Sequence, residues 1–220
     1  MKRYYDSRFE ELRDLLLRMS YLSVENFLRA LQGLFGRDTE LCEQVVREDS
    51  EIDQLELRID KLCQELLLTL QPVAKDLRFV TMSMRINTNL ERVGDQAVYI
   101  ARVGCDLAKL PPMPNLFGLP DLGLRAKTAV LQSIEAYIQE DVELARRIRA
   151  GDAGINRTHR EMIQKLLVHM MENPSQVAQA IELVFLAQSL ERVADYGKNI
   201  ADEVIYLVEA VDPRHQKEAG

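Results

Sequence analysis

LERVGDQAVYIA, residues 90–101, recurs one hundred residues later as LERVADYGKNIA, residues 190–201. Seven of the twelve positions are identical. They include the two acids of a Glu-x-x-x-Asp element: Glu91 and Asp95 in the first copy, Glu191 and Asp195 in the second. Earlier in each half, DTELCEQVVREDSEID (38–53) matches DVELARRIRAGDAGIN (141–156). Two matches in the same order indicate that the chain is an internal duplication.

The segments between the sparse glycines and prolines carry apolar residues at three- and four-residue spacing, which is typical of helices. This spacing predicts six helices, over residues 6–34, 39–69, 73–109, 121–139, 142–171 and 175–210. Asp38 is placed to cap the second helix, and Pro72 suits the first turn of the third. Because short connections make consecutive helices antiparallel neighbours, each half should form an up-down-up bundle.

The predicted fold is therefore all-α, with two tandem three-helix bundles related by internal duplication. The proline-rich stretch LPPMPNLFGLPDLG, residues 110–123, is the only clear linker. We expect a first bundle over residues 1–110, a linker over 111–120 and a second bundle over 121–220.

The composition excludes several classes of protein. With 28 basic against 35 acidic residues, the net charge is −7, so a nucleic-acid backbone is not expected as a partner. The longest uncharged stretch, Leu110–Pro120, contains four prolines, and the start of the chain lacks the apolar core of a signal peptide. The three cysteines, Cys42, Cys63 and Cys105, form no C-x-x-C pair and are typical of reduced thiols in a cytoplasmic protein.

Acidic residues four apart on a helix lie on the same face, one turn from each other. Glu91 and Asp95 form one such pair and Asp49 and Asp53 another, and both pairs border an apolar stripe. If their helices pack together, the four carboxylates meet along one seam. Such carboxylates repel each other unless a cation neutralises them. Oxygen ligands suit Mg²⁺, Ca²⁺, Mn²⁺ or ferric iron, and zinc also accepts them.

Two other interpretations stay open. A single Glu-x-x-x-Asp element usually lies on a solvated face, where Arg92 would be an ion-pair partner, so the chain could be a metal-free helical scaffold. A carboxylate-bridged metalloenzyme is the second alternative. Ferritin-like enzymes require Glu-x-x-His, but the residues three before the three histidines are not glutamates: they are Asn156, Leu166 and Asp212, before His159, His169 and His215. We therefore expect no enzymatic activity.

Five segments, in this order and at this spacing, resemble the PhoU family of phosphate-signalling regulators: VREDSEID (46–53), QPVAKDLR (71–78), INTNLERVGDQAVYIA (86–101), SLERVADYGKNIADEVIY (189–206) and DPRH (212–215). The resemblance implies the tandem-bundle fold and a negative regulator of phosphate uptake and of the phosphate-starvation response. It implies contacts with the ATPase subunit of a phosphate ABC transporter and with a sensor histidine kinase, and a homodimer. Membrane contact would then be made only through these partners.

The resemblance also implies multinuclear metal clusters, of iron or zinc, with magnesium, manganese and calcium left open. Carried over by position, it assigns the first cluster to Asp49, Asp53, Glu91 and Asp95, and the second to Asp152, Asn156, Glu191 and Asp195. Asn156 departs from the acidic pattern, because an amide oxygen can coordinate but brings no charge. Gly151 and Gly154 also weaken the helix around it. The second site should therefore hold fewer or more weakly bound ions.

Overall fold

The computed structural model describes residues 2–213, and this part of the chain contains six α-helices and no strand. The helices are α1 (Lys2–Gly36), α2 (Thr39–Leu70), α3 (Ala74–Ala108), α4 (Leu119–Gln139), α5 (Val142–Glu172) and α6 (Val177–Glu209), with a short 3₁₀ turn η1 (Pro174–Gln176) before the last. The all-α prediction is confirmed. Of the DPRH segment, Arg214 and His215 lie outside the described residues.

The helix ends follow local chemistry in most places. Asp38 caps α2 as predicted, since its Oδ1 accepts a hydrogen bond from the Leu41 backbone N–H at 3.0 Å. The prediction for Pro72 is wrong: α3 begins only at Ala74, after the N-cap Val73. The left-handed Gln71 (φ 46°) and the extended Val73 (φ −126°) reverse the chain here, so Pro72 lies in the turn and not in the helix.

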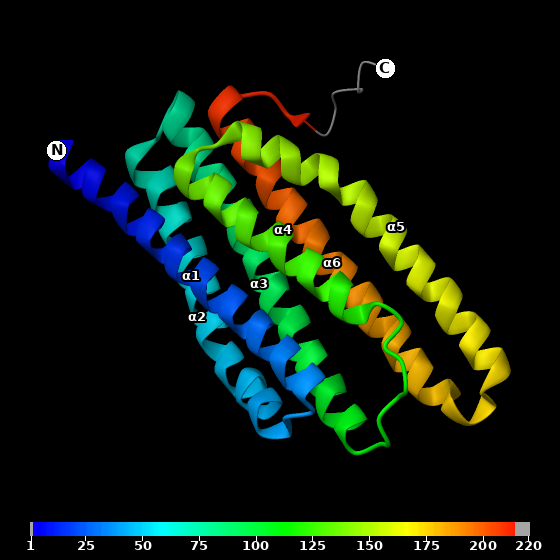
Figure 1. Ribbon diagram of the computed structural model, residues 1–220. Coiled ribbons are helices and arrows are strands. Elements are labelled where there is room, and N and C mark those ends of the chain that lie inside the picture. The colour runs from blue at the N-terminus through cyan, green and yellow to red at the C-terminus, as the bar shows by residue number, and fades with distance from the viewer. Residues whose placement is uncertain (1, 214–220) are drawn as a thin grey trace, which may run out of the picture.

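The helices form two sets of three. In Figure 1, α1 and α2 pack on α3, while α4 and α5 pack on α6, and α3 packs on α6 between the two sets. The two copies of the repeated stretch, residues 90–101 and 190–201, lie in α3 and α6 and so occupy equivalent places. This arrangement confirms the two tandem bundles.

The apolar core does not divide between the two bundles. One cluster of buried residues includes Phe27, Leu122 and Leu190 and lies at the end of the molecule that carries the linker. The other includes Ile59 and Ile200 and lies toward the end at which α1 begins and α6 ends (Figure 1). Each cluster draws side chains from both halves of the chain. The halves are therefore held together by two cores stacked along the long axis.

Within residues 2–213, none of the helices combines the length and the apolar composition needed to span a lipid bilayer.

Candidate functional site

The first predicted site lies where α2 packs on α3, and we call Asp49, Asp53, Glu91 and Asp95 the N-terminal seam. Gly94 brings the two helices close at this point. A β-carbon at Gly94 would stand 3.3 Å from the Asp49 Oδ1, so the Asp49 carboxylate lies against the α3 backbone beside Asp95. The glycine thus allows an acid of α2 to reach the acids of α3.

The carboxylates of the N-terminal seam share one electrostatic environment. Burial, followed by the charges of Asp53 and Asp95, raises the pKa of Asp49 to about 6, against an opposing effect of Arg102. Burial, the Asp95 charge and the Glu56 charge raise the pKa of Glu91 to about 7. The structure therefore brings together the four acids that the sequence pattern selected.

The seam continues beyond these four residues. Burial and the nearby charges of Asp60, Asp53 and Asp95 raise the pKa of Glu56. The fully buried Asn87 links the helices here, since its Nδ2 donates to the Glu56 carbonyl oxygen and to Asp60 Oδ1, both at 3.1 Å. Sequence reasoning missed these three residues. The spacing of the α2 acids was the available signal, because positions 49, 53, 56 and 60 lie on one helical face.

The second predicted site lies where α5 packs on α6, and we call Asp152, Asn156, Glu191 and Asp195 the C-terminal seam. Burial, followed by the charges of Glu191 and Asp152, raises the pKa of Asp195 to about 6. Burial and the Asp152 charge raise the pKa of Glu191. The four predicted residues again lie within electrostatic or hydrogen-bonding reach of one another.

A lysine that the sequence reasoning missed lies within the C-terminal seam. The Lys198 Nζ donates to Asp152 Oδ2 at 2.7 Å, and the same oxygen accepts from Asn156 Nδ2 at 3.1 Å. The Lys198 charge opposes the upward pKa shifts of Asp195 and Glu191. Alignment of the repeats would have shown that this lysine is specific to the second half, since the equivalent residue in the first half is Val98.

The donor chemistry of the N-terminal seam fits a hard or borderline cation. Its ligands are half-buried carboxylate oxygens that repel one another. Asn87 Oδ1 is also buried and accepts no hydrogen bond within the described structure. This oxygen, beside Asp60, could therefore serve as a further ligand to a cation. However, among residues 2–213 no three His, Cys, Asp or Glu side chains converge as a preformed site for one ion. The acids form a strip along the helices and not a closed cage.

The histidines take other positions. His159 follows Asp152 by two turns on α5, and burial lowers its pKa. His169 lies at the end of α5, where its Nε2 is 2.7 Å from Gln176 Oε1 and its ring packs against Phe117 at 4.9 Å between centroids. His215 lies outside the described residues.

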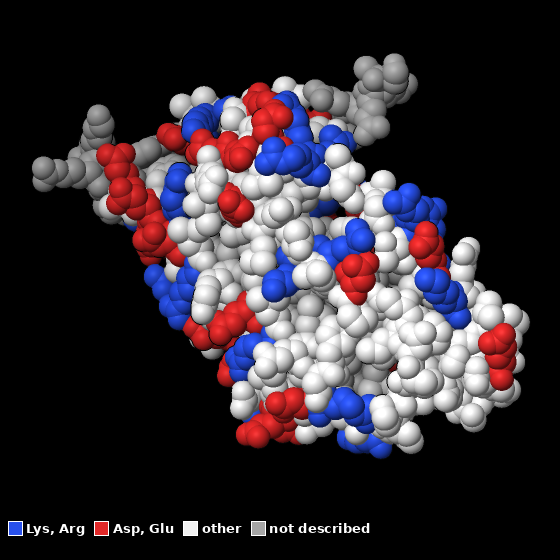
Figure 2. Space-filling view, viewed as in Figure 1, with Lys and Arg blue, Asp and Glu red and all other residues white. Residues whose placement is uncertain are grey.

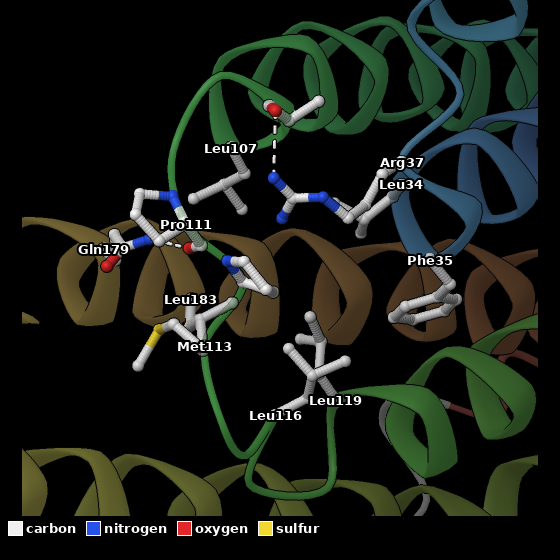
Figure 3. A pocket seen from close by; sticks show the side chains of 12 residues that line it. Leu34, Phe35, Arg37, Leu107, Pro111, Met113, Leu116, Leu119, Gln179 and Leu183 are labelled. Atoms are coloured by element: carbon white, nitrogen blue, oxygen red, sulfur yellow. Dashed lines mark hydrogen bonds between the residues drawn. The ribbon is translucent and has the colours of Figure 1, made fainter.

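A separate apolar cavity of about 180 Å³ lies beneath the linker, between the ends of α1, α3 and α6 (Figure 3). Arg37 Nη2 donates to the carbonyl oxygen of Ala108, the last residue of α3, at 2.9 Å and to that of Leu110 just beyond the helix. Gln179 Nε2 of α6 holds the linker itself, since it donates to the Pro111 carbonyl oxygen at 2.7 Å. None of the predicted site residues lines this cavity.

The outer face of α4 carries a row of exposed apolar residues at seven-residue spacing. Leu124, Leu131 and Ile138 are 58%, 40% and 53% exposed. In Figure 2 the surface over α4 is white in part, and groups of Lys and Arg (blue) and of Asp and Glu (red) lie among the white side chains. Exposed apolar side chains that share one face often mark a contact with another protein.

The chain is similar in sequence to proteins of phosphate transport. The family model described as "PhoU domain" matches residues 16–103 and again residues 119–204. A "Phosphate-specific transport system accessory protein PhoU homolog" from Pseudomonas putida is 32% identical over 212 residues, which cover 96% of this chain and 83% of the relative. The accessory protein PhoU of Escherichia coli strain K12 is 26% identical over 211 residues, covering 96% and 88%.

Two crystal structures share the arrangement of helices. PhoU from Pseudomonas aeruginosa matches with a TM-score of 0.92 at 30% identity, covering 94% of this chain and 100% of the other. The phosphate transport system regulatory protein PhoU from Streptococcus pneumoniae matches with a TM-score of 0.85 at 25% identity, covering 94% and 98%. Since both halves match the same domain and the match spans nearly all of the sequence, the chain belongs to the PhoU family.

Proposed function

We propose that this chain is an accessory regulatory protein of phosphate transport, which negatively regulates phosphate uptake and phosphate-starvation signalling. The match of both halves to the PhoU domain carries the proposal, because relatives that the chain matches over most of their length are named accessory or regulatory proteins of this system. The chain acts by contact and not by catalysis. Its partners are the ATPase subunit of a phosphate ABC transporter and a sensor histidine kinase, which it meets in the cytoplasm.

We further propose that the N-terminal seam binds metal, with iron or zinc as the first candidates. Asp49, Asp53, Glu91 and Asp95 would hold the ions, and Asn87 Oδ1 lies nearby as an additional oxygen. A bound cluster would neutralise the seam and link α2 to α3. This chain's own residues supply the oxygens, the partial burial and the close approach at Gly94.

A metal-free helical scaffold is the second candidate. It is favoured by the absence, among residues 2–213, of any preformed three-ligand group. Metal analysis of protein purified without chelator separates the two candidates: stoichiometric iron or zinc supports the metal-binding regulator, and a metal-free, functional protein supports the scaffold.

We place the contact of the proposed homodimer on the outer face of α4. In an antiparallel pair of α4 helices centred on Leu131, Leu124 of one copy meets Ile138 of the other, because both are seven residues from the centre. The half of α4 before Leu131 carries Lys127 and the other half carries Glu135, so antiparallel order also brings opposite charges alongside.

Leu131→Asp should convert the dimer to a monomer in sedimentation velocity. Leu167→Asp, at an exposed apolar position of α5, should leave the dimer intact, and a dimer that survives Leu131→Asp would exclude this face.

The regulatory role is tested by deletion of the gene. We expect phosphate-starvation genes to remain active in high phosphate in the deletion strain, and the wild-type gene to restore repression. Purified protein should stay in solution with plain lipid vesicles and co-sediment only when the transporter ATPase or the kinase is present. Normal repression in the deletion strain would contradict the proposal.

A further inference from the structure

The two seams differ at one pair of equivalent positions that determines how the carboxylates are neutralised. Alignment of the repeats pairs Val98 of α3 with Lys198 of α6. Val98 is a buried apolar residue, whereas the Lys198 Nζ lies 2.7 Å from Asp152 Oδ2. The Asp152 side chain is only 13% exposed, so solvent and salt screen this ion pair little.

Lys198 and Asn156 together occupy one of the two carboxylate oxygens of Asp152. Asp152 Oδ2 accepts from Lys198 Nζ at 2.7 Å and from Asn156 Nδ2 at 3.1 Å. A metal ion at this oxygen would have to displace both donors and approach an ammonium of like charge. In the N-terminal seam, Asp53 takes the place of Asn156, and Val98 takes the place of Lys198. Neither an ionised carboxylate nor an apolar side chain donates a hydrogen bond.

We propose that Lys198 is the permanent counter-ion of the C-terminal seam, so that its ammonium takes the place of a metal cation there and metal binding is confined to the N-terminal seam. This assignment rests on the metal binding proposed above, and it restricts that binding to the N-terminal half. Metal links α2 to α3 and leaves the contact between α5 and α6 unchanged. Asn156 alone would only weaken a second site, whereas Lys198 replaces the metal ion in it.

Metal content of seam variants tests the assignment. Purified full-length chain is stripped with chelator, loaded with Zn²⁺ or, separately, Fe²⁺, dialysed and analysed for bound metal. Glu91→Gln/Asp95→Asn should lose most of its metal, while Glu191→Gln/Asp195→Asn should keep it. Addition of Lys198→Val to Glu91→Gln/Asp95→Asn should restore metal binding, now at the C-terminal seam.

Two controls separate the charge at position 198 from general effects. Lys198→Arg keeps a cation beside Asp152 and should gain no metal. Lys165→Val removes a lysine at an exposed position of α5 and should also gain none. Circular dichroism confirms folding of each variant. Hydrogen exchange on the wild-type chain adds a measurement that needs no variant, since metal should protect amides of α2 and α3 and not those of α5 and α6.

The outcomes separate this assignment from the metal function itself. Equal metal loss in the two double variants, or no gain from Lys198→Val, would overturn the role of Lys198. Metal bound by Lys198→Val but not by the wild-type chain would support that role and refute metal binding as part of the normal function. Absence of metal from every variant would overturn both.

Discussion

The backbone of Gly197 in α6 lies directly against the backbone of Ala129 in α4. A β-carbon at Gly197 would stand 2.9 Å from the Ala129 carbonyl carbon and 3.0 Å from its oxygen, which is closer than real contacts allow. The equivalent residue in the first half is the fully buried Ala97. The close approach is therefore a property of the second bundle that the repeat does not share.

Gly197→Ala should destabilise the protein by about 1–3 kcal/mol, because backbone atoms can make room only if α4 separates from α6. The free energy of unfolding in urea measures the effect. An unchanged midpoint would mean that the two helices are farther apart than the structure shows.

Alanine at Gly151 should have the opposite effect. This residue lies inside α5, and a β-carbon there meets nothing within 4 Å. Since glycine costs about 0.5–1 kcal/mol in a helix relative to alanine, Gly151→Ala should raise stability by that amount. Gly154→Ala is an independent repeat of the test, because its β-carbon is also free of contacts. A loss of stability in both variants would contradict this account.

Asp38 and Asp141 cap equivalent helices in the two halves. Asp38 accepts from the Leu41 N–H at 3.0 Å, and Asp141 accepts from the Leu144 N–H at 2.9 Å. Replacement of either by alanine should cost about 1 kcal/mol. Asp106→Ala, which removes an exposed acid paired with the nearby and equally exposed Lys109, should change stability by less than about 0.5 kcal/mol. Thermal melting of the three variants compares them directly.

The metal-free protein should lose stability as the pH rises from about 4 to about 7.5. The folded-state pKa values of Asp49 (about 6) and Glu91 (about 7) are raised above their ordinary values of 3.8 and 4.5. The folded state therefore binds protons more tightly than the unfolded state. The resulting stabilisation is complete below the ordinary pKa values and is lost as the pH passes through the raised ones.

Melting temperatures in chelator across this pH range measure the effect. The variant Asp49→Asn/Glu91→Gln is the control, because it removes these two groups of the N-terminal seam and should show a flatter pH profile. If the two profiles have the same slope, the N-terminal seam does not account for the pH dependence.

Much of the architecture could be predicted from the sequence because it depends on short-range periodicity. The spacing of apolar residues placed the helices within a few residues of their observed ends, and the repeat placed residues 90–101 and 190–201 in equivalent helices. The acids of the seams were found for the same reason, since residues four apart share a helical face whatever the helix packs against. The turn at Pro72 was not predicted, because it depends on the left-handed backbone conformation of Gln71.

The sequence by itself determined an all-helical duplicated chain with acids in register on its helices, because these properties follow from local geometry. Only the tertiary structure decided which groups meet those acids. Asn87 reaches Asp60 across α2 and α3, and Lys198 reaches Asp152 across α5 and α6, and both contacts depend on how the paired helices are rotated and spaced. The two stacked cores shared by both halves likewise arise from the packing of α3 on α6, since burial between distant segments is set by their arrangement in space.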